Sequence, residues 1–344
     1  GGTGGGGTGG GTGGGGTGGG TGGGGTGGGT GGGGTGGGTG GGTGGFSDLT
    51  DPVTNEEIDG VGVSTQFDLT PQGSGAASVN LDQTTGDDGM TATFSTDDTG
   101  ELIALAFEVP TDSGLNFTFD SSNVAVFETV TFSGIEADFI DTIDEDAFAV
   151  LAFADDGGDF EFQNFGYWII DATDTSGSLG AGAFGFTTAN VPTNVTLTYE
   201  GSMLGLYTDA DGLLPFIDPT LDDAVTAATI AADVDVVVDT AGAGSFTFES
   251  SNTALFDIDT DAPLTGSGID TLQDSLAITG SGSLTGAELD GTITTGNGLS
   301  GEVNGRLFGP NAEEVGGSVV ATDTADPFSG RNLVAGFGAR QTTP

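Results

Sequence analysis

The sequence predicts an all-β protein preceded by an extended, glycine-rich segment, and three observations support this fold class. Gly1–Gly45 contains only glycine and threonine in a regular repeat. From about residue 76 onward, short runs alternate apolar and polar residues and are enriched in Val, Ile, Phe and Thr, as half-buried strands are. Turn-forming clusters such as STDDTG (95–100) separate these runs, and no segment shows a convincing amphipathic helical pattern.

The glycine-rich segment repeats the nine residues TGGGGTGGG. Nine is a multiple of three, and three residues make one turn of the extended left-handed helix that glycine-rich chains adopt. On such a helix the threonines at nine-residue spacing share an edge, and another edge carries only glycine until Thr43. Because this helix makes no internal hydrogen bonds, ordered copies need neighbours that complete those bonds.

We therefore predict that Gly1–Gly45 is a polyglycine-II-type segment that bundles with copies of itself through its bare glycine edge. The alternative is a flexible tether, which is typical of glycine-rich segments. The residues expected at the assembly contacts are Gly4, Gly7, Gly10, Gly13, Gly16, Gly19, Gly22, Gly25, Gly28, Gly31, Gly34, Gly37, Gly40, Thr12, Thr21 and Thr30.

The charge balance of the chain is strongly acidic and narrows its chemistry. Fifty Asp and Glu residues face three basic residues, Arg306, Arg331 and Arg340, which gives a net charge of −47. Nucleic acid and anionic membranes are unfavourable partners, because both need Lys and Arg patches. The chain has no lysine, histidine or cysteine. We therefore expect no catalytic constellation, no metal site and no cofactor, and we predict that the chain is not an enzyme.

The same acidity is typical of an exported protein in salty water, where counterions screen the repulsion between carboxylates. No run approaches the roughly 18 consecutive apolar residues that a membrane-spanning helix needs, so no membrane span is expected. We interpret the chain as a mature exported protein, located outside a bacterial cell or on its surface.

Four regions are predicted along the chain: the assembly segment 1–45, a polar connector 46–75, a β-rich domain 76–186 and a second β-rich domain 187–344. Trp168 is the only tryptophan and lies near the end of the first β-rich domain, where we expect it in the core. The strands expected in that domain are 76–81, 90–96, 101–109, 115–120, 123–132, 147–154 and 159–170.

Aspartate-rich loops raise the possibility of calcium binding. Asp257, Asp259 and Asp261 have the spacing of the first three ligands in an EF-hand loop. However, the position that needs glycine is Ala262 and the twelfth position is Gly268, so the pattern fails. We expect weak calcium binding at most.

The C-terminal region resembles a known family. The segments VPTNVTLTYEGSMLG (191–205) and GEVNGRLFGPNAEEVGGSVVAT (301–322), followed by VAGFGAR (334–340), are similar to the β-barrel domain of transferrin-binding protein B and related surface lipoproteins. Leu307 stands where that family has Phe, and Phe308 where it usually has Tyr. The positions that carry the resemblance at the predicted barrel corner are Tyr199, Gly305, Phe308, Gly309, Pro310, Glu314, Gly316 and Gly317.

The resemblance implies eight antiparallel strands around a packed interior, and nine candidate strands can be marked between residues 195 and 339. The shared residues also have a structural reason. Gly309 and Pro310 break a strand, Pro310 can open a single helical turn over 311–314, and Gly316–Gly317 allows a tight return into the sheet. We therefore predict that these residues form a barrel corner, which is a structural role and not a ligand site.

Two functions are compatible with these features. The first is a structural subunit of an extracellular filament or surface assembly, whose partners are copies of itself and whose β-domains are displayed outside. The second is a cell-surface module on a glycine tether that binds a solute or a surface or host protein, as the resemblance implies. The nine-residue phasing favours the first hypothesis, and the barrel resemblance favours the second.

Overall fold

The computed structural model describes residues 56–71, 77–81, 90–96, 102–109, 115–144, 146–153, 160–172, 176–209, 214, 227–258, 260–323, 325 and 330–342. The chain separates into two units, Gly1–Gly45 and Phe46–Pro344. All of the predicted assembly contacts lie outside the described residues and stay predictions. The expected limits of the β-rich domains also stay predictions, and the change from the first sheet to the second falls between Gly185 and Thr196.

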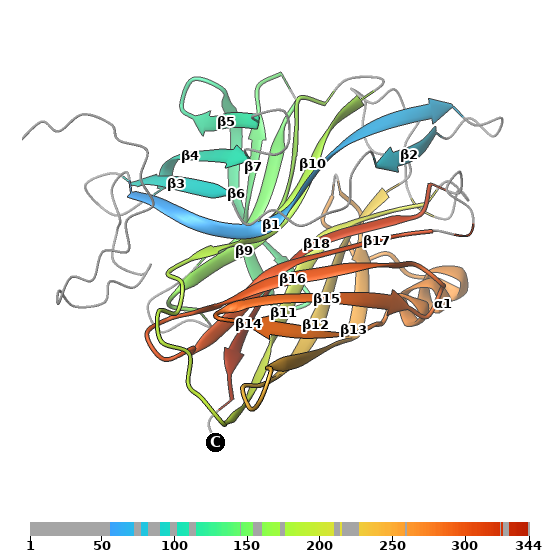
Figure 1. Ribbon diagram of the computed structural model, residues 1–344. Helices are drawn as coiled ribbons and strands as arrows, with labels where there is room; N and C mark the ends of the chain where they lie inside the picture. The colour runs from blue at the N-terminus through green and yellow to red at the C-terminus, as the bar shows by residue number, and fades with distance from the viewer. Residues whose placement is uncertain are drawn as a thin grey trace, which may run out of the picture. The chain divides into compact units, whose positions relative to one another are not determined.

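The described part is nearly all β, as the sequence predicts, and it contains two antiparallel sheets (Figure 1). The first sheet has the strand order β5-β4-β3-β1-β10-β9-β8-β7-β6, with β2 paired to β1. Its strands are β1 (Glu56–Pro71), β2 (Ala77–Leu81), β3 (Thr91–Thr96), β4 (Leu102–Val109), β5 (Leu115–Asp120), β6 (Val124–Phe132), β7 (Ile135–Thr142), β8 (Phe148–Ala152), β9 (Gln163–Ile170) and β10 (Ser176–Gly185).

Three strands of the first sheet were not predicted: β1, β7 and β10. Strand β1 lies inside the range that we expected to be a connector. It pairs with β3 near its start, with β10 along its middle and with β2 at its end, so its polar residues are tolerated in a strand with several partners. Strand β10 lacks a clear strand pattern in the sequence because many of its residues are small. Gly180 must be small, since a Cβ there would overlap the Trp168 ring.

The second sheet is a closed barrel, which confirms the eight antiparallel strands implied by the resemblance. Two of the nine candidate strands, 244–250 and 253–258, are one strand, β13. Its apparent break coincides with Asn252, whose φ is 52°, and with a register shift opposite Ala231 and Asp233. The barrel strands are β11 (Thr196–Thr208), β12 (Ala227–Asp239), β13 (Ser245–Phe256), β14 (Ile278–Thr285), β15 (Glu288–Thr295), β16 (Ser300–Phe308), β17 (Glu314–Thr322) and β18 (Asn332–Gln341).

A short helix, α1 (Ser267–Ser275), lies in a segment where the sequence shows no convincing amphipathic helical pattern. It joins β13 to β14 and buries Leu272, while Leu276 just beyond it is fully buried in the barrel core. The helix was missed because only a few apolar residues mark its inner face among Ser, Thr, Asp and Gln. No helix in the described residues has the length and apolar character needed to cross a membrane.

The outer face of the barrel packs against the first sheet through glycines. A Cβ on Gly336 of β18 would overlap the backbone of Gly166 in β9 and lie 2.8 Å from the carbonyl oxygen of Gly182 in β10. A hydrogen bond between the Tyr167 and Thr229 hydroxyl groups, 2.7 Å long, joins β9 to β12. Trp168 faces the other side of the first sheet, where it is fully buried and stacks on Phe107, so its predicted core role is confirmed.

Candidate functional site

The long connections of the barrel all lie at one end. Here β11 ends and β12 begins 19 residues later, at Thr208 and Ala227, and the connections 257–277 and 323–331 also belong to this end. At the opposite end, strands are joined by short turns at 240–244, 286–287 and 309–313. We call the first end the loop end. Loops carried by a rigid scaffold are where proteins most often place binding residues.

The loop end is also the acidic end of the barrel. The connections 209–226 and 257–277 carry five aspartates each, and 323–331 carries two aspartates together with Arg331. The turns at the opposite end carry a single carboxylate, Glu313. The asymmetry concentrates negative charge around the one arginine at this end.

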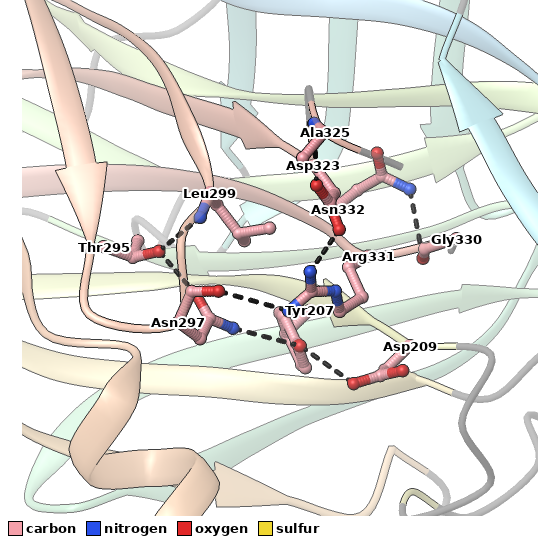
Figure 2. A network of polar contacts seen from close by, with 10 residues as sticks. All are labelled: Tyr207, Asp209, Thr295, Asn297, Leu299, Asp323, Ala325, Gly330, Arg331 and Asn332. Atoms are coloured by element: carbon pink, nitrogen blue, oxygen red, sulfur yellow. Dashed lines mark hydrogen bonds and ion pairs between the residues drawn. The ribbon is translucent and has the colours of Figure 1, made fainter. Parts of the chain in front are cut away.

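Arg331 is the centre of a polar network at the loop end (Figure 2). One guanidinium nitrogen forms an ion pair with the Asp323 carboxylate, whose side chain is only 3% exposed. The other terminal nitrogen donates a hydrogen bond to the carbonyl oxygen of Asn297 at 3.2 Å. Arg331 thus joins the β17–β18 connection to the β15–β16 turn.

The network continues to the end of β11 through a buried tyrosine. The Tyr207 hydroxyl donates to the Asp209 carboxylate at 3.0 Å and lies 3.4 Å from the side-chain amide nitrogen of Asn297, which donates to it. Both Tyr207 and Asp209 are buried. The side-chain hydroxyl of Thr295 accepts a hydrogen bond from the backbone N–H of Leu299, which closes the β15–β16 turn (Figure 2).

A second branch ties β11 to β18. The Thr208 hydroxyl donates to the carbonyl oxygen of Gly330 at 2.7 Å, and the Asn332 side-chain amide donates to the Thr208 hydroxyl at 3.1 Å. Asp323 also accepts a hydrogen bond from the backbone N–H of Ala325 at 3.0 Å. The network therefore fixes the start of the 209–226 connection, the β15–β16 turn and both ends of the 323–331 connection.

The charges in this network support one another. Burial alone would lower the pKa of Arg331, but the hydrogen bond and charge of Asp323, together with Tyr207 and Asp209, raise it above its usual value. Arg331 therefore stays cationic and offsets two buried carboxylates, which would otherwise be costly to bury. The network is suited to holding the bases of these connections in place.

At the opposite end, the predicted barrel corner is present, with one correction. Pro310 and its neighbours form a turn and not a helical turn, because Ala312 has a φ of 62°, in the left-handed region. The buried Tyr199 hydroxyl donates to the carbonyl oxygen of Ala312 at 2.9 Å and holds this conformation. Burial raises the pKa of the Tyr199 phenol, with a smaller contribution from the charge of Glu313, so that it remains a donor.

The structure brings Gly309, Phe308 and Glu314 to the contact with the first sheet. The hydroxyl of Thr188 donates to the carbonyl oxygen of Gly309 at 2.7 Å, and a Cβ on Gly185 would lie 2.8 Å from the Phe308 ring. Gly309 has a φ of 85°, which favours glycine. The corner is thus also a junction with the first sheet, a role that the sequence alone did not indicate.

Glu314 is the charged residue of this junction. Its carboxylate accepts hydrogen bonds from the backbone N–H groups of Glu161 at 2.6 Å and Phe162 at 3.1 Å. Burial raises the pKa of the Glu314 carboxyl to about 7, with a smaller contribution from the charge of Glu161. The two N–H donors and the charge of Arg340 act in the opposite direction.

The remaining predicted corner residues are glycines that face close neighbours. A Cβ on Gly316 would overlap the side-chain carbonyl of Gln163, and a Cβ on Gly317 would overlap the backbone of Asn304. A Cβ on Gly305 would lie 3.0 Å from the Gly316 carbonyl oxygen and 3.2 Å from the Phe337 ring. Gly316 therefore makes room for the first sheet, and Gly317 for the neighbouring strand.

The sequence did not single out Tyr207, Asn297 or Asp323 as site residues. One signal was available: a chain with three basic residues is expected to use each of them for a specific contact. In the aspartate-rich loop after β13, the Asp257 carboxylate accepts hydrogen bonds from the N–H and hydroxyl of Thr260, at 3.0 and 2.8 Å. Among the described residues, no group of three or more potential metal ligands comes together.

No known family model matches the chain, and no curated protein does. Its structure is similar to that of a surface lipoprotein, at 15% identity and a TM-score of 0.40, over 81% of this chain and 99% of that one. It is also similar to transferrin-binding protein B from Actinobacillus pleuropneumoniae H49, at 14% identity and a TM-score of 0.38, over 81% and 99% of the two chains. It is also similar to isotype 1 transferrin-binding protein B from serogroup B Neisseria meningitidis, at 12% identity and a TM-score of 0.33, over 75% of this chain and 52% of that one.

These solved structures are of the same kind as the family that the C-terminal segments resemble. At these identities and TM-scores, no residue role is transferred from them, because a fold hosts many functions.

Proposed function

We propose that this chain is a bacterial cell-surface module that binds a protein with a basic surface through the loop end of its barrel. The observation that carries the proposal is the segregation of the long, acidic connections at one end of a closed barrel. A charged loop cluster attracts an oppositely charged partner and speeds its encounter. The Arg331 network supports this role, because it holds the bases of the 209–226 and 323–331 connections in fixed positions and lowers the ordering cost of binding.

The proposal involves no catalytic step and no cofactor. Attachment to the cell surface follows the resemblance of the 301–322 segment to surface lipoproteins and remains part of the proposal. The filament function predicted from the nonapeptide repeat concerns Gly1–Gly45, so nothing in the described residues supports it. It stays a separate prediction and is tested by its own substitutions.

The binding test uses cytochrome c as a basic probe and lysine-acetylated cytochrome c as its neutralised match. We expect the full chain to bind the basic form and not the acetylated form, with an affinity that falls as salt is raised. Replacing the exposed residues Asp270 and Asp274 of α1 with asparagine should weaken this binding several-fold.

The matched control replaces Asp235 and Asp290, two exposed residues on the barrel wall, with asparagine. It removes the same charge from the protein, so it reports the contribution of net charge alone. Equal weakening by the two pairs would assign the binding to general electrostatics and contradict a site at the loop end. Binding that does not distinguish the two forms of the probe would contradict a basic partner.

A further inference from the structure

Four buried polar atoms without a hydrogen-bond partner gather where β16 and β17 face the first sheet. They are Gln163 Oε1, Asn304 Nδ2, Arg306 Nε and Ser318 Oγ. Only two further side-chain atoms of this kind occur in the described residues, on Trp168 and Thr253. Buried polar groups without partners are rare in proteins, so a concentration of them calls for an explanation, of which a bound water or ion is one.

The strand register places these groups on one face. Asn304 is directly opposite Ser318, and Arg306 is directly opposite Gly316. Successive side chains alternate between the faces of a strand, and the intervening Leu307 and Val303 belong to the barrel core. Asn304, Arg306 and Ser318 are therefore on the outer face of the barrel.

Gln163 reaches the same place from the first sheet. Its side-chain carbonyl would overlap a Cβ on Gly316, so it lies over the position next to Arg306. Its amide nitrogen donates to the carbonyl oxygen of Val315 at 3.0 Å, which fixes the direction in which the amide points. The glycine at position 316 is what allows this approach.

The contacts of Arg306 leave it incompletely satisfied. One terminal nitrogen donates to the carbonyl oxygen of Gly60 at 3.4 Å, and the other lies 3.6 Å from a carboxylate oxygen of Glu288, a side chain that is 52% exposed. Both contacts are long, while the arginine side chain is only 8% exposed. A buried guanidinium is stable only when its N–H groups have acceptors, and Nε has none among the described protein groups.

The four groups define the chemistry of the bound molecule. Arg306 Nε and Asn304 Nδ2 can only donate, the Ser318 hydroxyl can do either, and Gln163 Oε1 can only accept. A ligand that serves all of them must accept and donate hydrogen bonds within a small volume. Water does both, whereas a halide or a carboxylate would repel the Gln163 oxygen.

We propose that Gln163, Asn304, Arg306 and Ser318 form an internal hydration site that joins the barrel to the first sheet through at least one ordered water. Buried waters of this kind typically make about three hydrogen bonds and are costly to remove. The site supplies a hydrogen-bond acceptor to Nε of Arg306, the chain's most buried arginine, without requiring a further carboxylate. It does not depend on the proposed binding function.

A crystal structure of the full chain, grown with and without sodium bromide, tests the site directly. We expect density for a water within hydrogen-bonding distance of both Arg306 Nε and Gln163 Oε1 in the two conditions. An anomalous bromide peak between these atoms would overturn the proposal in favour of an anion site. Direct side-chain bonds among the four residues, with no molecule between them, would overturn it as well.

Oxygen-17 relaxation dispersion in solution gives an independent measurement, because it detects waters that stay bound for long times. Asn304→Leu keeps the side-chain shape but removes the amide, and we expect it to lose part of the long-lived water contribution. Thr253→Val is the matched control, since it removes an unpartnered polar atom outside the cluster and should leave that contribution unchanged. An unchanged contribution in a folded Asn304→Leu protein would contradict the site.

Discussion

The Glu314 carboxylate accepts a hydrogen bond of 2.6 Å from the backbone N–H of Glu161, which lies 153 residues earlier in the chain. This contact joins the barrel to the segment before β9 and buries an acid whose charge is costly to bury. It makes the junction between the two sheets sensitive to pH.

Glu314 predicts a fall in stability as the pH rises through the weakly acidic range. Its pKa is about 7 in the folded state and near 4.5 in the unfolded chain. The folded state therefore holds the proton more tightly, so the contribution is fully present below pH 4.5 and is lost as the pH approaches about 7. The whole window corresponds to about 3 kcal/mol in the free energy of unfolding.

Urea unfolding at several pH values measures this contribution. We expect Glu314→Gln to flatten the dependence between pH 4.5 and 7, although it also weakens the contact with the N–H groups. Glu313→Gln removes the same charge at the next position, where the carboxylate accepts hydrogen bonds from Asn311, and should keep the wild-type slope. A parallel slope in all three proteins would show that Glu314 does not titrate in this range.

Removing Arg331 should destabilise the barrel. In Arg331→Met, the buried carboxylates of Asp323 and Asp209 lose their nearest cation, and we expect a loss of about 2 kcal/mol in the free energy of unfolding. The double variant Arg331→Met with Asp323→Asn should recover part of that loss, because it no longer buries an unpaired carboxylate. Additive effects in this double-mutant cycle would mean that the two residues do not interact.

Gly316 should resist even the smallest substitution. In Gly316→Ala the new methyl group overlaps the Gln163 side chain, and we expect a cost of about 1–3 kcal/mol from overpacking. The additional substitution Gln163→Ala should restore part of the loss, because it removes the closest overlapping atoms and leaves the Ala183 Cβ at 2.8 Å. Thermal or urea unfolding measures both effects, and a second variant no more stable than the first would locate the strain elsewhere.

The glycine edge of the N-terminal segment is tested by matched substitutions. If this edge packs against other copies, Gly13→Val and Gly22→Val should abolish assembly, whereas Thr12→Val and Thr21→Val should be tolerated. Two helices alone should not stay associated. Ordering each residue costs about 1–2 kcal/mol, whereas each hydrogen bond contributes only about 0.5–1.5 kcal/mol net. Light scattering at high protein concentration and high salt distinguishes the cases. Equal tolerance of all four changes would reduce the segment to a tether.

Much of the secondary structure could be predicted because strand signals are local. Alternation of apolar and polar residues marks most strands of the first sheet, and segments 301–322 and 334–340 carry a resemblance that implies the barrel. Two of the missed strands, β1 and β10, share a cause. Strand β10 and the polar β1 lack alternation because they pack closely against neighbouring strands and ring faces, and that requirement is set by residues far away in the sequence.

The all-β class, the core position of Trp168 and the acidic balance that disfavours nucleic acid as a partner could be predicted from the sequence, and eight barrel strands from its resemblance to a known family. The roles of the few charged core residues could be found only in the folded structure. Arg331 meets Asp323 and Asn297 because barrel closure brings β15–β16 and β17–β18 to the same end. Glu314 meets Glu161 because the outer face of the barrel packs on the first sheet. Such pairings depend on strand register and sheet packing, which are set by the fold as a whole and leave no local pattern in the sequence.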